Sequence, residues 1–318
     1  GIIIILLSFK ICYSNLIKNP RAFLLSILPV LLIMPFIYSS WTQNNYLYKH
    51  RNYYGVYKVY EEYGKIVLVH GSTIHGAQFK DKQKENQPLT YYHKLTPIGA
   101  YLSSSEVGKN IGVIGLGTGA LAAYARDGQE IDYFEIDPDM HFIAQNLFTF
   151  IKHSRGKINF IFGDARIKIK EAKAARYDLL VVDAFSGDTI PVHLLTTEAL
   201  NEYRKHLTDQ GVILVHISNR YLNFIPVLFS NANYLNAYAC YKENETDSRK
   251  DLFGTTWFAL SWNFSSFSKL VTEFKWVRYV PGKNRLIRPW TDKYSNMFLI
   301  MKLNNFLNSI RYFQPFYW

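Results

Sequence analysis

Cysteine, charged residues and N-terminal acids are all scarce in this chain of 318 residues, and each shortage excludes a class of protein. The two cysteines, Cys12 and Cys240, are too few for a disulfide framework or a thiolate metal site. Charged residues make up 19% of the chain and hydrophobic residues 48%, which excludes a disordered, collagen-like or coiled-coil protein. The net charge is +11, and residues 1–60 contain lysine and arginine but no acid. Basic residues beside an apolar segment fit a membrane margin better than a nucleic-acid groove, so we expect no nucleic-acid partner.

The N-terminal segment predicts attachment to a membrane. Residues Ala22 to Tyr38 carry no charge, and Trp41 follows as an interfacial aromatic. Seventeen apolar residues are at the short limit for a helix that crosses the ~30 Å hydrocarbon core. The apolar run at residues 1–7 starts without a methionine, and we interpret it as a truncated span. We therefore expect a membrane region at residues 1–42 and a membrane protein with a soluble catalytic domain. A buried soluble helix and a signal peptide are the alternatives, and basic residues on both flanks leave the orientation open.

The rest of the chain predicts a small β region followed by an α/β domain. Residues 53–60 and 65–70 alternate as two strands of a hairpin within a subdomain at 43–100. From residue 101 to 318, uniformly apolar strands alternate with helical segments, which indicates a Rossmann-like, doubly wound and mostly parallel sheet. We expect strands at 111–115, 131–136, 158–162, 177–183, 211–217, 238–242 and 256–261, and helices at 120–126, 140–151 and 197–207.

A glycine-rich loop points to a nucleoside site. Gly115, Gly117 and Gly119 lie directly after one predicted strand and before a helix, where glycine allows a tight turn and a close approach of a ligand. Glu135 ends the next strand, in the place where a carboxylate accepts hydrogen bonds from ribose hydroxyls. Asp137 is better placed as the cap of the helix after Pro138. The loop alone also allows NAD.

Two further carboxylates follow the next two strands and favour a different ligand. Asp164 ends the third strand, where it can accept from the adenine amine, and Asp183 ends the fourth. Three acids on successive strand tips suit a cationic sulfonium nucleoside and an amine, and they suit a pyrophosphate poorly. The structural alternatives are a helix cap for Asp164 and a loop cap for Asp183.

Several segments resemble the spermidine synthases, the polyamine aminopropyltransferases, from about Arg51 to Asn296. The resemblance is closest to the membrane-fused branch, in which a transporter-like region precedes the synthase domain. It rests on the segments RNYYGVYKV, LVHGSTIHGAQ, PLTYYH, GLGTGALAAYARDGQ, FEID, GDAR, LVVDAFSGDTIPVHLLT and PWTDKYSN.

The resemblance implies transfer of an aminopropyl group from decarboxylated S-adenosylmethionine to an amine such as putrescine, without a metal. It implies that Asp183 is the base and that Tyr92 and His93 line the meeting point of nucleoside and amine. It further implies homo-oligomers and a donor site made by Gly115, Gly117, Thr118, Gly119, Glu135, Asp164 and Ala165.

Three departures from the family pattern leave the substrate open. Thr118 stands where the synthases have an aspartate for the donor's amino group, Ser186 replaces a second aspartate, and His75 replaces a glutamine. Ordinary S-adenosylmethionine and methyl transfer form one alternative, because threonine tolerates a carboxylated donor. A non-catalytic domain that senses a nucleoside or polyamine for an attached transporter is the other. We assign His206 and His216 no function and expect them at surface and strand positions.

Overall fold

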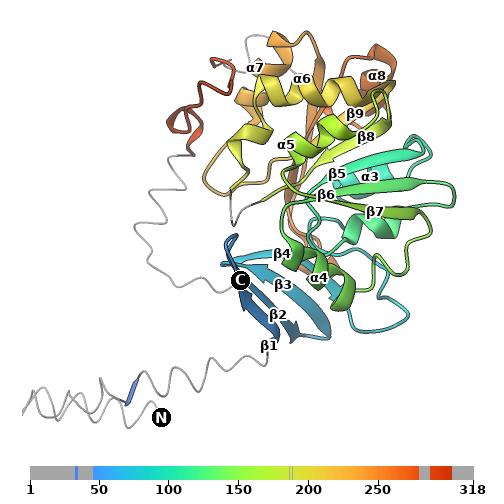
Figure 1. Cartoon of the computed structure of the whole chain (residues 1–318), viewed down its shortest axis with the longest axis vertical. Helices are drawn as coiled ribbons and strands as arrows, with labels where there is room; N and C mark the ends of the chain where they lie inside the picture. The colour runs from blue at the N-terminus through green and yellow to red at the C-terminus, as the bar shows by residue number, and fades with distance from the viewer. Residues whose placement is uncertain (1–32, 35–45, 186, 188, 279–286, 303–318) are drawn as a thin grey trace, which may run out of the picture. The chain divides into compact units, whose positions relative to one another are not determined.

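The computed structural model describes residues 33–34, 46–185, 187, 189–278 and 287–302 (Figure 1). The chain divides into two compact units, residues 1–45 and 46–318, of which the second contains both sheets. Within the described ranges, no helix is both long enough and apolar enough to cross a membrane. Apart from Ile33 and Met34, the expected span at Ala22–Tyr38 lies outside those ranges.

The first sheet is a four-stranded antiparallel meander in sequence order. Its inner strands form the predicted hairpin, with Glu62 opposite Lys65. Tyr63 and Gly64 form the turn and both have positive φ, as a type I′ turn requires. The outer strands were not predicted. The strands are β1 (Tyr46–Arg51), β2 (Val56–Glu62), β3 (Lys65–His70) and β4 (Thr73–Phe79).

The second sheet has eight strands in the order β12-β10-β11-β9-β8-β5-β6-β7. The five strands from β9 to β7 pair in parallel, and the remaining three add antiparallel pairs at one side. This arrangement confirms the predicted Rossmann-like, mostly parallel sheet. The strands are β5 (Asn110–Ile114), β6 (Glu130–Glu135), β7 (Lys157–Phe162), β8 (Tyr177–Val182), β9 (Leu207–His216), β10 (Tyr238–Asn244), β11 (Thr255–Ser261) and β12 (Val277–Arg278).

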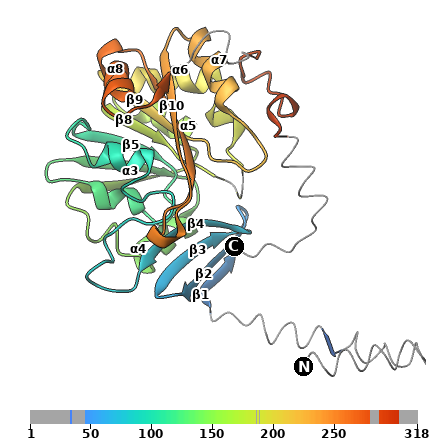
Figure 2. The ribbon, with the colours of Figure 1, turned by 180° about the vertical axis from the view of Figure 1, so that it is seen from behind.

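Helices cover both faces of this sheet, which explains why its central strands are apolar throughout. In β8, Leu180 belongs to one buried cluster while Leu179 and Val181 belong to the other. One face packs against α3 (Pro97–Leu102), the 3-10 helix η1 (Ala120–Tyr124), α4 (Pro138–Asn146) and α8 (Phe264–Thr272). The other packs against α5 (Ala165–Lys168), α6 (Thr197–His206) and α7 (Ile225–Tyr234). The view from behind shows α8 next to β10 (Figure 2).

Two predicted helices differ from the structure, and one of them, expected at 140–151, is α4 and ends at Asn146. The segment after the glycine loop is the five-residue η1 rather than an α-helix that reaches Arg126. The helix ends at Tyr124 because the backbone of the next residue, Ala125, is extended. Four more short 3-10 helices lie in the described residues: η2 (Ile169–Glu171), η3 (Val192–Leu194), η4 (Ser248–Lys250) and η5 (Phe298–Ile300).

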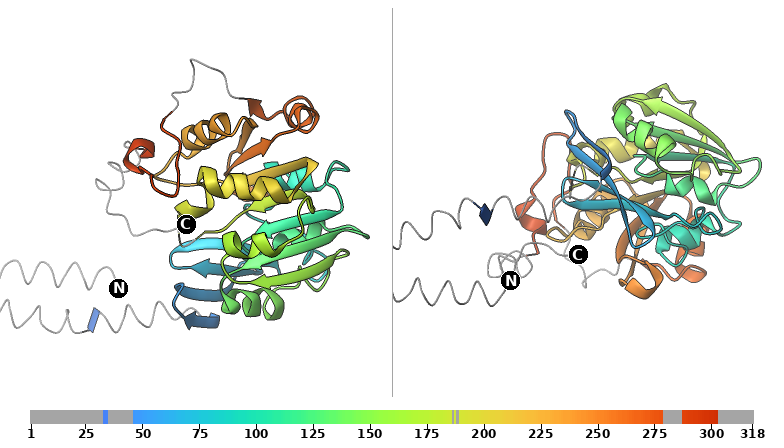
Figure 3. Two further views of the ribbon diagram at one scale, coloured as in Figure 1. Left: turned by 45° about the horizontal axis from the view of Figure 1, so that its top comes forward. Right: turned by 90° about the horizontal axis from the view of Figure 1, so that it is seen from below.

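The strand order places the predicted site at the centre of the large sheet. The chain winds outward in one direction from β5 through β6 to β7 and in the other from β8 to β9, so the order reverses between β5 and β8. Open α/β sheets bind ligands at the carboxyl ends of the strands beside such a reversal. The small sheet packs next to those ends (Figure 1 and Figure 3). Tyr57 on β2 donates a hydrogen bond to Asp137, which follows β6, and Gln78 on β4 donates one to Thr149.

Candidate functional site

The glycine loop after β5 lies directly against the end of β8. Gly115 has φ of +97°, and a Cβ atom there would lie 2.4 Å from the backbone oxygen of Asp183. The Asp183 N–H also donates to the Ile114 oxygen at 2.8 Å. Gly117 and Gly119 continue the loop with φ of +53° and +76°. Glycine at position 115 therefore lets two predicted parts of the site, the loop and the base, touch through their backbones.

Glu135 joins this loop to the end of β6. Its Oε2 accepts the Leu116 N–H at 2.9 Å and its Oε1 accepts the Asp137 N–H at 2.8 Å. Burial raises the pKa of Glu135 to about 7, although these N–H donors act in the opposite direction. The carboxylate thus lies against the glycine loop, and its negative charge is costly to form in this buried position.

Asp137 caps α4, as the sequence predicted. Its carboxylate accepts the Asp139 N–H at 2.9 Å, and it also accepts from the Tyr57 hydroxyl at 2.5 Å and from the Asn52 amide at 2.8 Å. Both of these partners come from the segment that forms the small sheet. Asp137 therefore ties the small sheet to the strand end that carries Glu135.

Asp164 takes the capping position that was its structural alternative. It caps α5 by accepting the Arg166 N–H at 2.8 Å, and His193 Nε2 lies 3.5 Å from its Oδ2. Ala165 beside it is buried. A carboxylate oxygen that accepts from the backbone still has a free lone pair, so the cap does not prevent contact with an adenine amine.

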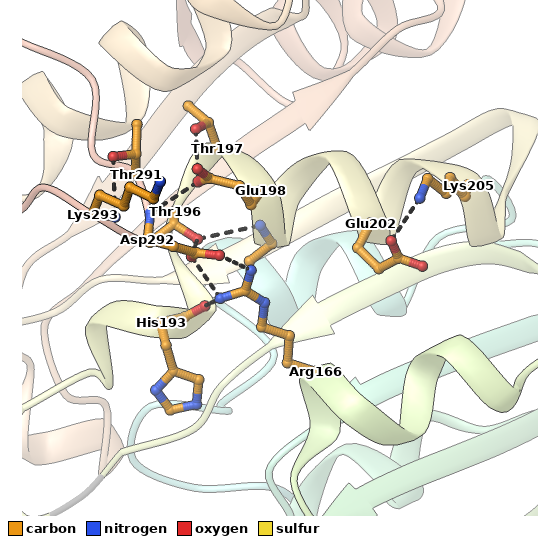
Figure 4. A network of polar contacts seen from close by, with 11 residues as sticks. Arg166, His193, Thr196, Thr197, Glu198, Glu202, Lys205, Thr291, Asp292 and Lys293 are labelled. Carbon is orange, nitrogen blue, oxygen red and sulfur yellow. Dashed lines mark hydrogen bonds and ion pairs between the residues drawn. The ribbon is translucent and has the colours of Figure 1, made fainter.

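The C-terminal segment is anchored next to Asp164. The guanidinium of Arg166 donates to both carboxylate oxygens of Asp292 and to the backbone oxygen of His193 (Figure 4). The Thr196 hydroxyl, which caps α6, also donates to Asp292 at 2.8 Å. Hydrogen bonds from Arg166 lower the pKa of Asp292. This network holds the residues around Asp164 in place through two-pronged, charge-assisted bonds.

The side chain of Asp183 is enclosed at the end of β8. Its side chain is 5% exposed and is hydrogen-bonded to Tyr92. Burial, and then the charge of Asp183, raise the pKa of Tyr92, so the phenol keeps its proton and donates. His216 Nδ1 lies 2.8 Å from Asp183 Oδ1. The sequence prediction gave His216 no function, and the structure corrects this by placing it at the predicted base.

His93 lies apart from this group. Its Nδ1 accepts the Leu95 N–H at 3.2 Å, and the charges that act on it come from Lys94, Asp251 and Lys250. Tyr91 takes a place beside Tyr92 instead, with its ring 5.7 Å from that of His216. The structure thus brings Tyr92 to Asp183 and does not bring His93 there.

A cavity of about 830 Å³ opens beside Asp183. Tyr92 and His216, which both bond Asp183, line it together with Phe185. Two carboxylates, Glu243 and Glu245, are among its other lining residues. In the described part of the chain, no three His, Cys, Asp or Glu side chains gather as metal ligands. The cavity therefore lies next to the two side chains that bond Asp183, and two acids of its lining give it negative charge.

Strand β4 forms the wall between this cavity and the glycine loop. His75 lines the cavity, and burial lowers its pKa to about 3, so it is neutral there. A Cβ on the next residue, Gly76, would lie 2.7 Å from Thr118 Cγ2. Thr118 is 1% exposed, and its hydroxyl has no hydrogen-bond partner among the described residues. Neither His75 nor Thr118 supplies a negative charge to a ligand.

Comparisons with known proteins give relatives in sequence and in fold. No family model matches the chain. The chain is 28% identical over 207 residues to a polyamine aminopropyltransferase of Vibrio vulnificus, a match that covers 62% of this chain and 66% of that protein, just under two thirds. It is also 32% identical to an N-terminal histidine N-methyltransferase of Emericella nidulans over 117 residues. This match covers 35% of this chain and 20% of that protein.

Two solved structures share the fold. A probable spermidine synthase from Corynebacterium glutamicum superposes with a TM-score of 0.58 at 12% identity, over 78% of this chain and 98% of that one. The spermidine synthase of Thermotoga maritima gives 0.50 at 13% identity, over 83% of this chain and 86% of that one. The sequence relative and the shared fold together support the resemblance to spermidine synthases. No comparison bears on the membrane-fused branch.

Proposed function

We propose that this protein is an aminopropyltransferase that moves an aminopropyl group from decarboxylated S-adenosylmethionine to an amine. The observation that carries the proposal is Asp183, a carboxylate with a buried side chain whose backbone touches the glycine loop and whose partners Tyr92 and His216 line a cavity. A likeness in sequence to a polyamine aminopropyltransferase supports it independently.

The reaction needs a base for the acceptor, and Asp183 supplies it. An amine is protonated at neutral pH, so its ammonium first donates a proton to the Asp183 carboxylate. The freed nitrogen attacks the aminopropyl carbon next to sulfur, the carbon–sulfur bond breaks, and methylthioadenosine leaves with the bonding electron pair. Tyr92 donates to Asp183 and fixes the carboxylate. Glu135 and Asp164 bind the nucleoside, and the remaining catalysis is alignment.

The acceptor needs no second positive charge near Asp183, because Ser186 stands where the resemblance implies a second aspartate. His75 is neutral, and Thr118 is a buried, uncharged residue. The predicted departure at Ser186 lies outside the described residues. Glu243 and Glu245 in the cavity lining offer negative charge at another place. A monoamine, or a polyamine whose second ammonium reaches these two acids, fits this distribution.

Methyl transfer from ordinary S-adenosylmethionine is the second candidate. Thr118 favours it, because an uncharged residue at that position tolerates the carboxylate of the donor. The likeness to an N-terminal histidine N-methyltransferase supports it over about a third of the chain. A binding-only domain that senses a nucleoside or polyamine is the third candidate, and a buried base has no purpose in such a domain.

We also propose that the chain belongs to the membrane-fused branch and is attached to a membrane by its N-terminal segment. The uncharged run at residues 22–38 and the basic residues around it support this. Full-length protein should sediment with membranes and stay there in alkaline carbonate, which releases peripheral proteins. Recovery in the supernatant would contradict the attachment.

The activity test compares both donors with a panel of amines and identifies the nucleoside product by mass spectrometry. Methylthioadenosine together with an acceptor heavier by one aminopropyl group is the expected result, and S-adenosylhomocysteine would establish methyl transfer instead. Asp183→Asn should lower turnover by about 10²- to 10⁴-fold while binding of methylthioadenosine persists. Asp209→Asn, at an exposed position on β9, is the matched control. Loss of binding and turnover together in Asp183→Asn would make Asp183 a structural residue.

A further inference from the structure

His216 is a buried histidine whose two ring nitrogens both have partners. It ends β9, and its side chain is only 4% exposed. Nδ1 lies 2.8 Å from Asp183 Oδ1, and Nε2 lies 2.7 Å from the hydroxyl oxygen of Ser218. A histidine on a strand that is hydrogen-bonded at both ring nitrogens has a fixed side-chain orientation.

The partners of the two ring nitrogens determine which nitrogen of His216 carries the proton. The Thr256 N–H donates to Ser218 Oγ at 2.9 Å, so that oxygen already accepts a bond from the backbone. The ionised Asp183 carboxylate can only accept, so the ring proton of His216 lies on Nδ1 and is donated to Asp183. In a neutral imidazole the other nitrogen accepts, so Nε2 accepts from the Ser218 hydroxyl, whose hydrogen is free for this bond.

Aromatic packing holds the imidazole in this orientation. The ring of Trp257 stacks on it with centroids 4.5 Å apart and planes within 6°. Trp257 is the residue opposite His216 in the β11–β9 pair, so the sheet itself sets this contact. Phe185 packs edge-on at 5.0 Å. The imidazole can neither flip nor tilt without a loss of these contacts.

We propose that His216 is the positioning residue of the transfer reaction, and that Asp183 and Ser218 fix its tautomer so that Nδ1–H orients the Asp183 carboxylate toward the acceptor amine. This role rests on the proposed function. One oxygen of Asp183 is held by the N–H of His216 and the carboxylate is also bonded to Tyr92, so two side chains that line the cavity fix the carboxylate. The histidine itself takes no proton from the amine.

A pair of substitutions of similar size separates this role from simple packing. His216→Leu removes the donor, and His216→Asn keeps one, since an asparagine Nδ2 occupies nearly the position of imidazole Nδ1. A hydrogen bond to a charged group is strong enough that His216→Leu should lower kcat by about 10- to 100-fold. The KM for the donor and the affinity for methylthioadenosine should change less than about twofold, and His216→Asn should recover most of kcat. His206→Leu, at a second buried histidine on α6, is the control for loss of an imidazole.

A histidine ¹H–¹⁵N spectrum of the full-length protein tests the geometry without any turnover. The resonance that disappears in His216→Leu should show the Nδ1–H tautomer, and Asp183→Ala should shift it. An Nε2–H tautomer, or a His216→Leu variant as active as the wild type, would overturn the inference. Absence of turnover in the wild type with every donor would refute the proposed function, and in that case the spectrum would still decide whether His216 holds Asp183.

Discussion

The raised pKa of Glu135 predicts that nucleoside binding strengthens as the pH rises toward neutrality. Burial raises this pKa to about 7 in the free protein, whereas an exposed glutamate has 4.5. Ribose hydroxyls donate best to an ionised carboxylate, so binding draws the proton off Glu135. At about pH 5.5 only roughly one site in thirty is ionised, and each pH unit below 7 therefore costs about tenfold in affinity.

Titration calorimetry with methylthioadenosine between about pH 5.5 and 8.5 measures this effect. We expect affinity to rise about sixteenfold between pH 5.5 and 7 and about twofold more by pH 8.5, where it levels off, with release of nearly one proton per ligand at the acidic end. The proton count comes from repeating the titration in buffers of different ionisation enthalpy. Glu135→Gln should bind weakly and show no dependence on pH.

The control for this experiment is His193, whose Nε2 lies 3.5 Å from Asp164 at the predicted nucleoside site. The His193→Gln variant should keep the wild-type pH profile. A flat wild-type profile, or a profile that Glu135→Gln retains and His193→Gln loses, would refute the assignment to Glu135.

The stability of the ligand-free protein should follow the opposite trend. The folded state keeps the Glu135 proton up to about pH 7, while the unfolded chain loses it near 4.5. The folded state thus binds more protons in this window, and the contribution of Glu135 to the free energy of unfolding falls as the pH rises. Urea unfolding of the wild type and Glu135→Gln at both ends of the window measures the difference.

Two substitutions test how the small sheet supports the site. Asp137→Ala removes the cap of α4 and leaves the buried Tyr57 hydroxyl without its acceptor, so urea unfolding should show a loss of about 2–4 kcal/mol; a loss below about 1 kcal/mol would contradict these roles. Gly76→Ala places a methyl group against Thr118 at a φ of +153°, so calorimetry should show weaker nucleoside binding, and unchanged affinity would mean that β4 does not constrain the glycine loop.

The sequence predicted the parts of the fold whose cause is local. Strands buried on both faces need continuous apolar runs, and those runs identified every parallel strand of the large sheet to within a few residues. The glycine loop and the Asp137 cap depend on neighbours in sequence, and both were predicted correctly. Strands β1 and β4 were missed because their sequences, YLYKHR and TIHGAQF, are polar or contain glycine and have no strong alternation. They form strands because the β2–β3 hairpin offers them edges to pair with.

The contacts of Asp183 could not be predicted because they depend on strand order. His216 and Asp183 are 33 residues apart in sequence, and nothing local links a histidine at a strand end to a distant acid. The register supplies the link, since Val182 pairs with Val215 and the next residue on each strand is Asp183 and His216. Knowledge that β8 and β9 are adjacent would have been enough to find the pair.

The strand order also governs when the site can form during synthesis. The meander β1–β4 pairs only consecutive strands, so its contacts are local and can form early. Strand β5 instead pairs with β8, which is synthesised after β6 and β7. The ring of His216 can stack on Trp257 only after β11 has been synthesised. A ribosome-bound chain that ends before β11 thus has a glycine loop and a base but an open edge at β9. Assembly of Asp183 with its partners is therefore a late event, and premature termination anywhere up to Trp257 leaves a nascent protein without an organised site.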